Sequence, residues 1–241
     1  MDIDKLMSNE RITKLDNEVI KKAKERYKDY ENDIESIRFL FQNCCYNNNR
    51  LKEEFDRSRG GFGKPSQLEL EKIVENFKIE KSKTLNIGIP ITFWAYIYLF
   101  EFHSLLSNLI RCCNFITKFK MELIDDFKPD KSPTISKYCC NFYKRQIKNN
   151  KEDLHRYLIK NFNEWIKNVN DIRNDVMHNF IEVSLKGRLL IKVTRTENEI
   201  LYGGDVELSL PSLKVENIEK YSNECLDNLE TFIRQFFIHL I

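Results

Sequence analysis

The sequence predicts a mainly α-helical protein, a helical bundle with a small antiparallel β-hairpin or meander near residues 188–210. Apolar residues recur at steps of three and four over most of the chain, as on the buried face of a helix. Gly and Pro number only 7 and 5, so long regular elements can form. After residue 185 the pattern changes to strict alternation, which is typical of strands.

The composition indicates a folded protein and leaves its partner open. The chain has 241 residues, enough for one large domain or one domain with an extension. Its formal net charge of +2 neither demands nor excludes nucleic acid. We predict a helical extension over residues 1–82 and a helical domain over 83–241, with the β-hairpin inserted at about 187–210.

The first predicted helix carries one apolar stripe, from Leu15 to Phe41. Basic residues occupy much of the rest of this segment. They form either a solvated helix face or, as the sharper alternative, a surface that binds RNA. These residues are Lys21, Lys22, Lys24, Arg26 and Lys28.

Breaks and caps divide the next part of the chain. Asn47–Asn49 interrupts the apolar stripe, which predicts the end of one helix before a short charged helix at Arg50–Arg59. The clearest break is the segment Gly60–Pro65. Ser66 followed three residues later by Glu69 predicts a capping box at the start of another helix.

The most apolar run, Ile87–Phe102, predicts a buried core helix that begins at Pro90 after an irregular stretch over residues 78–88. A membrane-spanning helix is the alternative for this run. Such a helix needs about 20 mostly apolar residues. The run is shorter and interrupted, so we expect no membrane association.

The seven cysteines predict packing and not metal binding. Six form adjacent pairs, and no C-x-x-C spacing of a zinc site is present. The odd count and the lack of a secretory leader favour reduced thiols in the cytoplasm. We therefore expect no metal and no cofactor, and we expect buried side chains for Cys44, Cys45, Cys112, Cys113, Cys139 and Cys140.

The second half of the chain predicts three helices and a strand region. A helix is expected over Ile135–Ile147, and a longer one carries an apolar stripe over Leu154–Phe180. Strands are expected at Leu189–Val193 and within Ile200–Leu210, and a last helix over Val215–Leu240.

The candidate site lies on the longer helix, within the length of its apolar stripe. Arg173 is followed directly by Asn174 and, five positions later, by His178. On a helical wheel with Ile172 at zero, Asn174 and His178 fall at about 200° and 240°, opposite the apolar stripe, and Arg173 at about 100°, on its flank. Asn174 and His178 are therefore expected to face water or another surface.

Arg and His together suit the cleavage of RNA without a metal. A His can accept the proton of the attacking 2′-hydroxyl or protonate the leaving 5′-oxygen. A guanidinium can bind two oxygens of the charged phosphoryl group, and an Asn can orient the His or bind a phosphate oxygen. One helix supplies only one His, so a symmetric dimer is expected to complete both proton transfers.

The segment Arg173-Asn174-Asp175-Val176-Met177-His178 resembles the R-x(4–6)-H motif of the HEPN superfamily in its Arg-Asn-x-x-x-His form. The resemblance implies an all-α bundle, usually a homodimer whose two motifs meet at a cleft. Many members are metal-independent RNases of toxin–antitoxin, antiviral defence and RNA-processing systems, and their products carry 2′,3′-cyclic phosphate and 5′-hydroxyl ends. It implies that Arg173 and His178 are the catalytic pair, with Asn174 beside them, and that an antitoxin is a possible partner.

Simpler interpretations stay open. Arg173 can instead form a surface ion pair with Asp171 or Asp175, and a non-catalytic helical module that binds RNA, a nucleotide or a protein fits the same motif. The spacing also recurs from Arg234 to His239, around an apolar segment without the Asn, which indicates packing.

Basic clusters flank the motif helix and are candidates for contacts with RNA phosphates, with solvated surface as the alternative. The candidate RNA-binding residues are Lys144, Arg145, Lys148, Lys186 and Arg188.

Overall fold

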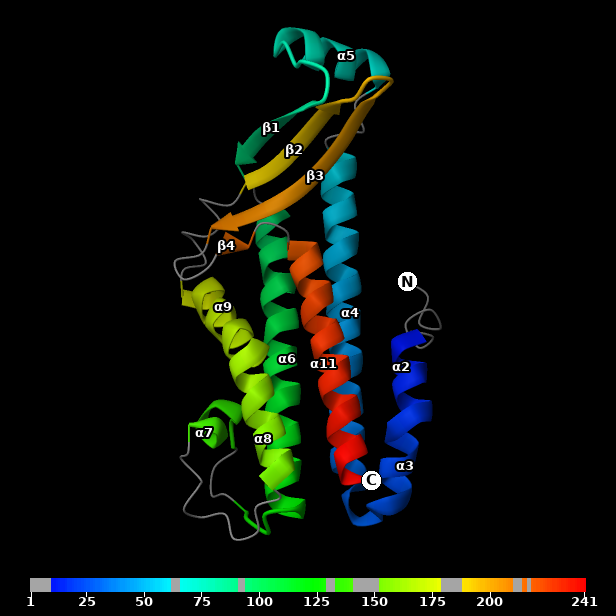
Figure 1. Cartoon of the computed structure of the whole chain (residues 1–241), viewed down its shortest axis with the longest axis vertical. Helices are drawn as coiled ribbons and strands as arrows, with labels where there is room; N and C mark the ends of the chain where they lie inside the picture. The colour runs from blue at the N-terminus through cyan, green and yellow to red at the C-terminus, as the bar shows by residue number, and fades with distance from the viewer. Residues whose placement is uncertain are drawn as a thin grey trace. The chain divides into compact units, whose positions relative to one another are not determined.

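The chain was analysed as a computed structural model, which describes residues 10–61, 66–90, 94–128, 133–140, 152–178, 188–209, 214–215 and 218–241. Figure 1 shows these residues as helices with a small antiparallel sheet, which confirms the predicted mainly α fold. The α-helices are α2 (Glu10–Leu15), α3 (Lys21–Arg26), α4 (Glu31–Gly61), α5 (Gln67–Asn76), α6 (Trp94–Leu123), α7 (Ile135–Cys139), α8 (Glu152–Asn161), α9 (Lys167–His178) and α11 (Ile218–Leu240). The strands are β1 (Lys83–Pro90), β2 (Arg188–Arg195), β3 (Ile200–Ser209) and β4 (Lys214–Val215).

The chain divides into two compact units. Unit 1 holds residues 1–48, 104–173 and 223–241, and unit 2 holds residues 49–103 and 174–222. Both units draw residues from either side of the expected boundary between residues 82 and 83. That boundary stays a prediction.

The core of unit 1 is built from apolar faces of α4, α6 and α11. Phe119 of α6 is 1% exposed and meets the rings of Tyr30, Phe236 and Phe237 edge-on, with centroids 5.7 to 6.2 Å apart. Each such edge-to-face pair stabilises the fold by about 0.5–1.5 kcal/mol, in addition to the stabilisation from the apolar area that it buries. This cluster ties the N-terminal segment and the last helix to α6.

The N-terminal stripe is interrupted at Tyr27, where the sequence predicted no break. The π-helix η1 (Asp16–Ile20) joins α2 to α3, and the 3₁₀ helix η2 (Lys28–Tyr30) leads into α4. Tyr27 leaves helical geometry at φ −118° and ψ 59°, and its hydroxyl donates to the carbonyl of Leu240 over 2.7 Å. This contact with the last helix stabilises the turn.

The predicted helix break at Asn47–Asn49 is wrong, because α4 continues through it to Gly61. Asn47 and Asn48 are 8% and 3% exposed. The amide nitrogen of Asn48 donates to Oδ1 of Asn223 in α11 over 3.0 Å, so its polarity is partly satisfied inside the core. The charged segment after it is the second half of the same helix.

The start of α5 confirms the predicted capping box. The backbone N–H of Glu69 donates to the Ser66 hydroxyl over 3.3 Å, and the N–H of Ser66 donates to the Glu69 carboxylate over 2.8 Å. The hydrogen bond from the Ser66 backbone lowers the pKa of Glu69, because it favours the ionised carboxylate.

The sheet of unit 2 has the order β1-β2-β3-β4, with antiparallel pairing throughout. The predicted strands after residue 187 are confirmed, and β3 continues through Gly203 and Gly204 as one strand. Val215 lies in the short strand β4 and not at the start of the last helix, which corrects the expected boundary.

Strand β1 is the main correction to the predicted fold. Residues 83–88 of the stretch expected to be irregular belong to β1, which pairs with β2 along its whole length, from Lys83 opposite Arg195 to Pro90 opposite Arg188. Pro90 therefore ends a strand instead of beginning a helix, and α6 begins at Trp94. The sheet is not a simple insertion at residues 187–210, because one of its strands comes from a distant part of the sequence.

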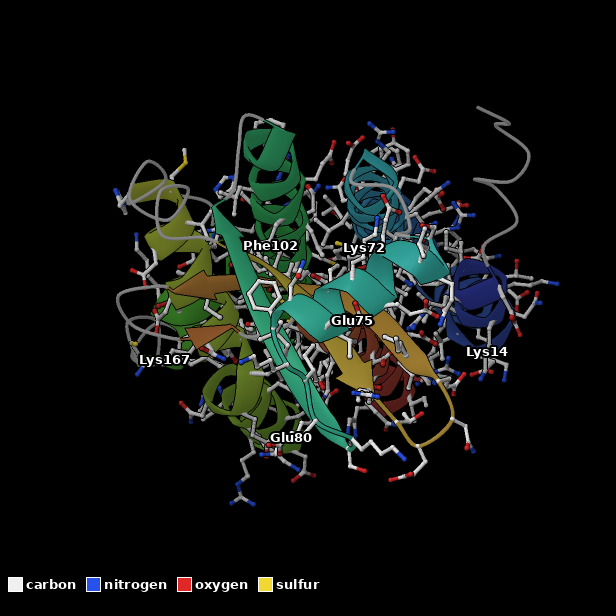
Figure 2. The ribbon with its side chains drawn as sticks, turned by 90° about the horizontal axis from the view of Figure 1, so that it is seen from above. Lys14, Lys72, Glu75, Glu80, Phe102 and Lys167 are labelled. Atoms are coloured by element: carbon white, nitrogen blue, oxygen red, sulfur yellow. The ribbon has the colours of Figure 1, made fainter. Side chains whose placement is uncertain are left out.

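Helix α5 packs on this sheet through a small core of its own. Leu70 and Val74 of α5 are buried against Ile79 and the fully buried Val193 of β2. Figure 2 shows α5 over the strands, with Lys72 and Glu75 labelled on it. Arg195 of β2 donates to the carbonyl of Ile79 over 3.1 Å, which joins the strand to the turn after α5.

The cysteine prediction is confirmed for most of the pairs. Cys44, Cys45, Cys112 and Cys113 are free and buried, and burial raises the pKa of Cys45 to about 12. Cys139 is half-buried. Cys140 is exposed, so the expectation was wrong there. Within the described part of the chain, no helix has the length and apolar character needed to cross a membrane.

Candidate functional site

The motif helix is built as the sequence predicted, with one local departure. Leu158, Phe162, Val169 and Ile172 are buried along α8 and α9, and the intervening turn, Phe162–Ile166, is a π-helix, η3. Its wider turn carries Ile166 into the core at 0% exposure, whereas Trp165 of the predicted stripe is only half-buried.

The three motif residues all lie on α9 (Lys167–His178). Arg173 and Asn174 are half-buried and His178 is exposed. Burial lowers the pKa of the Arg173 guanidinium, because a charged group loses hydration there. Along this helix, Arg173 and His178 project about 140° apart, so one copy of the helix does not bring them together.

Arg173 lines a small pocket that lies wholly within unit 1. Its volume is about 120 Å³. Residues from α6, α7, η3 and α9 form the walls, so the pocket exists only because four segments meet. The lining residues are Ile110, Asn114, Thr134, Ile135, Ser136, Phe162, Ile166, Asn170 and Arg173.

Hydrogen bonds hold the α7 wall of this pocket in place. The backbone N–H of Ile135 donates to Oδ1 of Asn114 over 3.0 Å, which links α7 to α6 and sets the orientation of the Asn114 amide. The Thr134 hydroxyl accepts from the backbone N–H of Lys137 over 3.3 Å and caps α7.

A buried polar network holds the other side of α7. The Lys120 ammonium lies 2.7 and 2.9 Å from the two carboxylate oxygens of Asp125 and 2.5 Å from the hydroxyl of Tyr138. That hydroxyl is 2.9 Å from Nδ1 of His155 on α8. Burial lowers the pKa of Lys120 and raises that of Asp125, although their mutual hydrogen bonds oppose both shifts.

The second Arg-to-His spacing, on α11, has different surroundings. Arg234 forms ion pairs with Glu18 and Glu230, and the second of these contacts measures 2.8 Å. The ring of His239 lies 5.3 Å from that of Tyr157. Between them, Phe236 and Phe237 are fully buried, in keeping with the packing role expected for this segment.

The described part of the chain does not test the basic residues proposed for RNA contacts. Lys144, Arg145, Lys148 and Lys186 lie outside the described residues, and Arg188 is described only as the first residue of β2. Their role stays a prediction. In the described ranges, no group of three or more His, Cys, Asp and Glu side chains is arranged to hold a metal ion.

Sequence inspection missed the pocket residues and the network around Lys120. Asn114 and Asn170 carry no motif. The sequence marks each of them only as a polar residue at the edge of an apolar helical stripe. Lys120 at the end of an apolar helix, with Asp125 five residues later, was the one visible hint of a buried ion pair.

Comparisons with known proteins do not assign the chain to a family. No family model matches the chain, and neither a curated protein nor a solved structure matches it.

Proposed function

We propose that the chain is a metal-independent endoribonuclease of HEPN type, acting as a toxin or defence effector. The observation that carries the proposal is the Arg-Asn-x-x-x-His segment on α9, which ends in an exposed His178 and has Arg173 lining a pocket. A half-buried guanidinium beside a cavity is suited to bind an anionic ligand, because the low local dielectric strengthens the attraction.

The proposed reaction moves two protons. A base removes the proton of the RNA 2′-hydroxyl, whose oxygen attacks the adjacent phosphorus. The bond from phosphorus to the 5′-oxygen breaks, and this oxygen takes a proton from an acid. The products are a 2′,3′-cyclic phosphate and a 5′-hydroxyl. Each His178 performs one of the two proton transfers. Arg173 neutralises the charge on the phosphoryl oxygens, and Asn174 binds a phosphate oxygen or orients the His.

Two copies of α9 are needed for this chemistry. One copy supplies one His178, and Arg173 projects about 140° away from it on the helix. A twofold axis beside the exposed end of α9 would bring two motifs to one cleft. The active species in the proposal is therefore a homodimer, with RNA bound across it and an antitoxin as a possible further partner.

The decisive experiment incubates the purified protein with RNA in EDTA and identifies the ends of the products. We expect cleavage with 2′,3′-cyclic phosphate and 5′-hydroxyl ends, and loss of cleavage in both Arg173→Ala and His178→Ala. If the RNA stays intact, the protein is instead a non-catalytic module. If both variants cut like the parent, Arg173 and His178 are not the catalytic residues and the proposed site is wrong. If the protein is strictly monomeric in sedimentation at concentrations where it cuts, the shared-cleft mechanism is wrong.

A further inference from the structure

We infer that the pocket beside Arg173 receives one unpaired base of the RNA and makes the protein selective for that base. The inference rests on the proposed function for its RNA substrate. The size of the pocket, its apolar walls and the hydrogen bonds around it support the inference. None of its residues other than Arg173 belongs to the motif.

The size of the pocket limits the ligand to a small group. Its volume is about 120 Å³. Pockets for whole cofactors or drug-sized ligands usually measure about 300–1,000 Å³. A single heterocyclic base or a phosphate is therefore the largest part of a nucleotide that it can enclose.

The walls favour a base over a phosphate. Ile110, Phe162 and Ile166 are apolar and at most 8% exposed, so their side chains offer apolar contact but no hydrogen bonds. A phosphate enclosed there would leave several charged oxygens desolvated. A base has apolar faces, which stack on aromatic rings and guanidinium planes, and it carries its hydrogen-bonding groups only at its edge.

Three of the lining residues, Asn114, Ser136 and Asn170, carry amide or hydroxyl groups of the kind that can bind the edge of a base. Asn side chains can form two hydrogen bonds with one base, and such a pair discriminates between bases by about 1–3 kcal/mol. Arg173 lines the same pocket, so it can hold the phosphate attached to the bound nucleotide.

Hydrogen bonds connect the framework around the pocket. The Asn114 amide is oriented by the Ile135 N–H, and Tyr138 anchors α7 through Lys120 and His155. The π-helix η3 supplies Phe162 and Ile166 to the wall. Single π-helical turns often occur at functional sites, because they shift side chains out of the regular helical position.

The first test measures binding of AMP, GMP, CMP and UMP, with ribose 5-phosphate and inorganic phosphate as probes without a base. We expect one base to bind about tenfold or more tightly than the others, and the probes without a base to bind more weakly. Asn170→Leu should remove this preference. Asn168→Leu should keep it, because Asn168 is exposed on the same helix and outside the pocket. Equal binding of all four nucleotides by the parent protein would overturn the inference.

The second test measures cleavage of single-stranded oligonucleotides that differ at one position. We expect the preferred base beside the cut, and a loss of about tenfold in selectivity for Asn170→Leu. Ser136→Leu, which fills the pocket from α7, gives a second variant should Asn170→Leu fail to fold. Unchanged selectivity in the folded variants overturns the inference. Base-selective binding without any cleavage by the parent protein would instead disprove only the nuclease.

Discussion

Two helices of this protein carry an Arg and a His five positions apart, and their surroundings differ. On α9, Arg173 lines a pocket, and burial lowers the pKa of its guanidinium. On α11, the Arg234 guanidinium is paired with two carboxylates, those of Glu18 and Glu230. Both histidines, His178 and His239, are exposed, so exposure of the His does not distinguish the two segments.

The difference lies in what surrounds each Arg and in the residues enclosed by the spacing. Arg234 pairs with the carboxylates of Glu18 and Glu230, whereas Arg173 lines a pocket. Phe236 and Phe237 make the inner face of α11 a part of the core, whereas the matching positions of α9 hold Asp175 and the buried Val176. A spacing becomes a candidate site only where the Arg faces a cavity that a ligand can enter.

The largest expected effect separates the two segments by activity. Arg173→Ala and His178→Ala should each lower the cleavage rate by about 100- to 10,000-fold, the range for losing an acid–base or electrostatic catalytic group. Arg234→Ala and His239→Ala should keep cleavage within about threefold of the parent once folding is confirmed by circular dichroism. Cleavage rates on one RNA measure all four. Loss of activity in a folded His239→Ala protein would move the site to α11.

The second-largest expected effect is a loss of stability when a core residue of α11 is removed. Phe236→Ala should lower the free energy of unfolding by about 3–5 kcal/mol, because it removes a fully buried ring and leaves a cavity. Met177→Ala on α9 is the control: its side chain is 61% exposed, and it should change stability by less than about 0.5 kcal/mol. Urea unfolding compares the two. Equal effects would contradict the burial of Phe236 in the core and the exposure of Met177.

A similar loss is expected from the network beneath the pocket. Lys120→Met should cost about 3–5 kcal/mol of folding free energy, because it leaves the carboxylate of Asp125 buried without its cation. The double variant Lys120→Met with Asp125→Leu should recover much of this loss. The stability of Lys120→Met should improve at acidic pH, where the buried carboxyl is protonated, since burial raises the pKa of Asp125. A loss that is independent of pH would mean that Asp125 finds another partner.

The smallest expected effect tests the ion pairs of Arg234. Arg234→Ala should lower the free energy of unfolding by about 1 kcal/mol, because its side chain is 18% exposed and solvent screens part of the attraction. High salt should reduce the difference from the parent. Thermal unfolding at two ionic strengths measures it. No change in either condition would show that the ion pairs with Glu18 and Glu230 do not stabilise α11.

Local patterns predicted much of the fold, because helices and caps depend on nearby residues. The capping box at Ser66 and the apolar stripe of α8 and α9 follow from spacings of three and four. Local patterns gave wrong predictions at Asn48 and in β1, because partners distant in the chain stabilise the observed structure. Asn48 is hydrogen-bonded to the Asn223 side chain, and Lys83–Pro90 pairs with the backbone of β2.

The helical period alone predicts the helical class of the protein, the position of the Arg-Asn-x-x-x-His segment on a helix and the exposure of its His. The folded chain adds that Arg173 lines a pocket and that Arg234 pairs with acidic residues. These features could not be predicted, because a pocket or an ion pair joins residues far apart in the chain. Spacing along one helix carries no information about what packs against it.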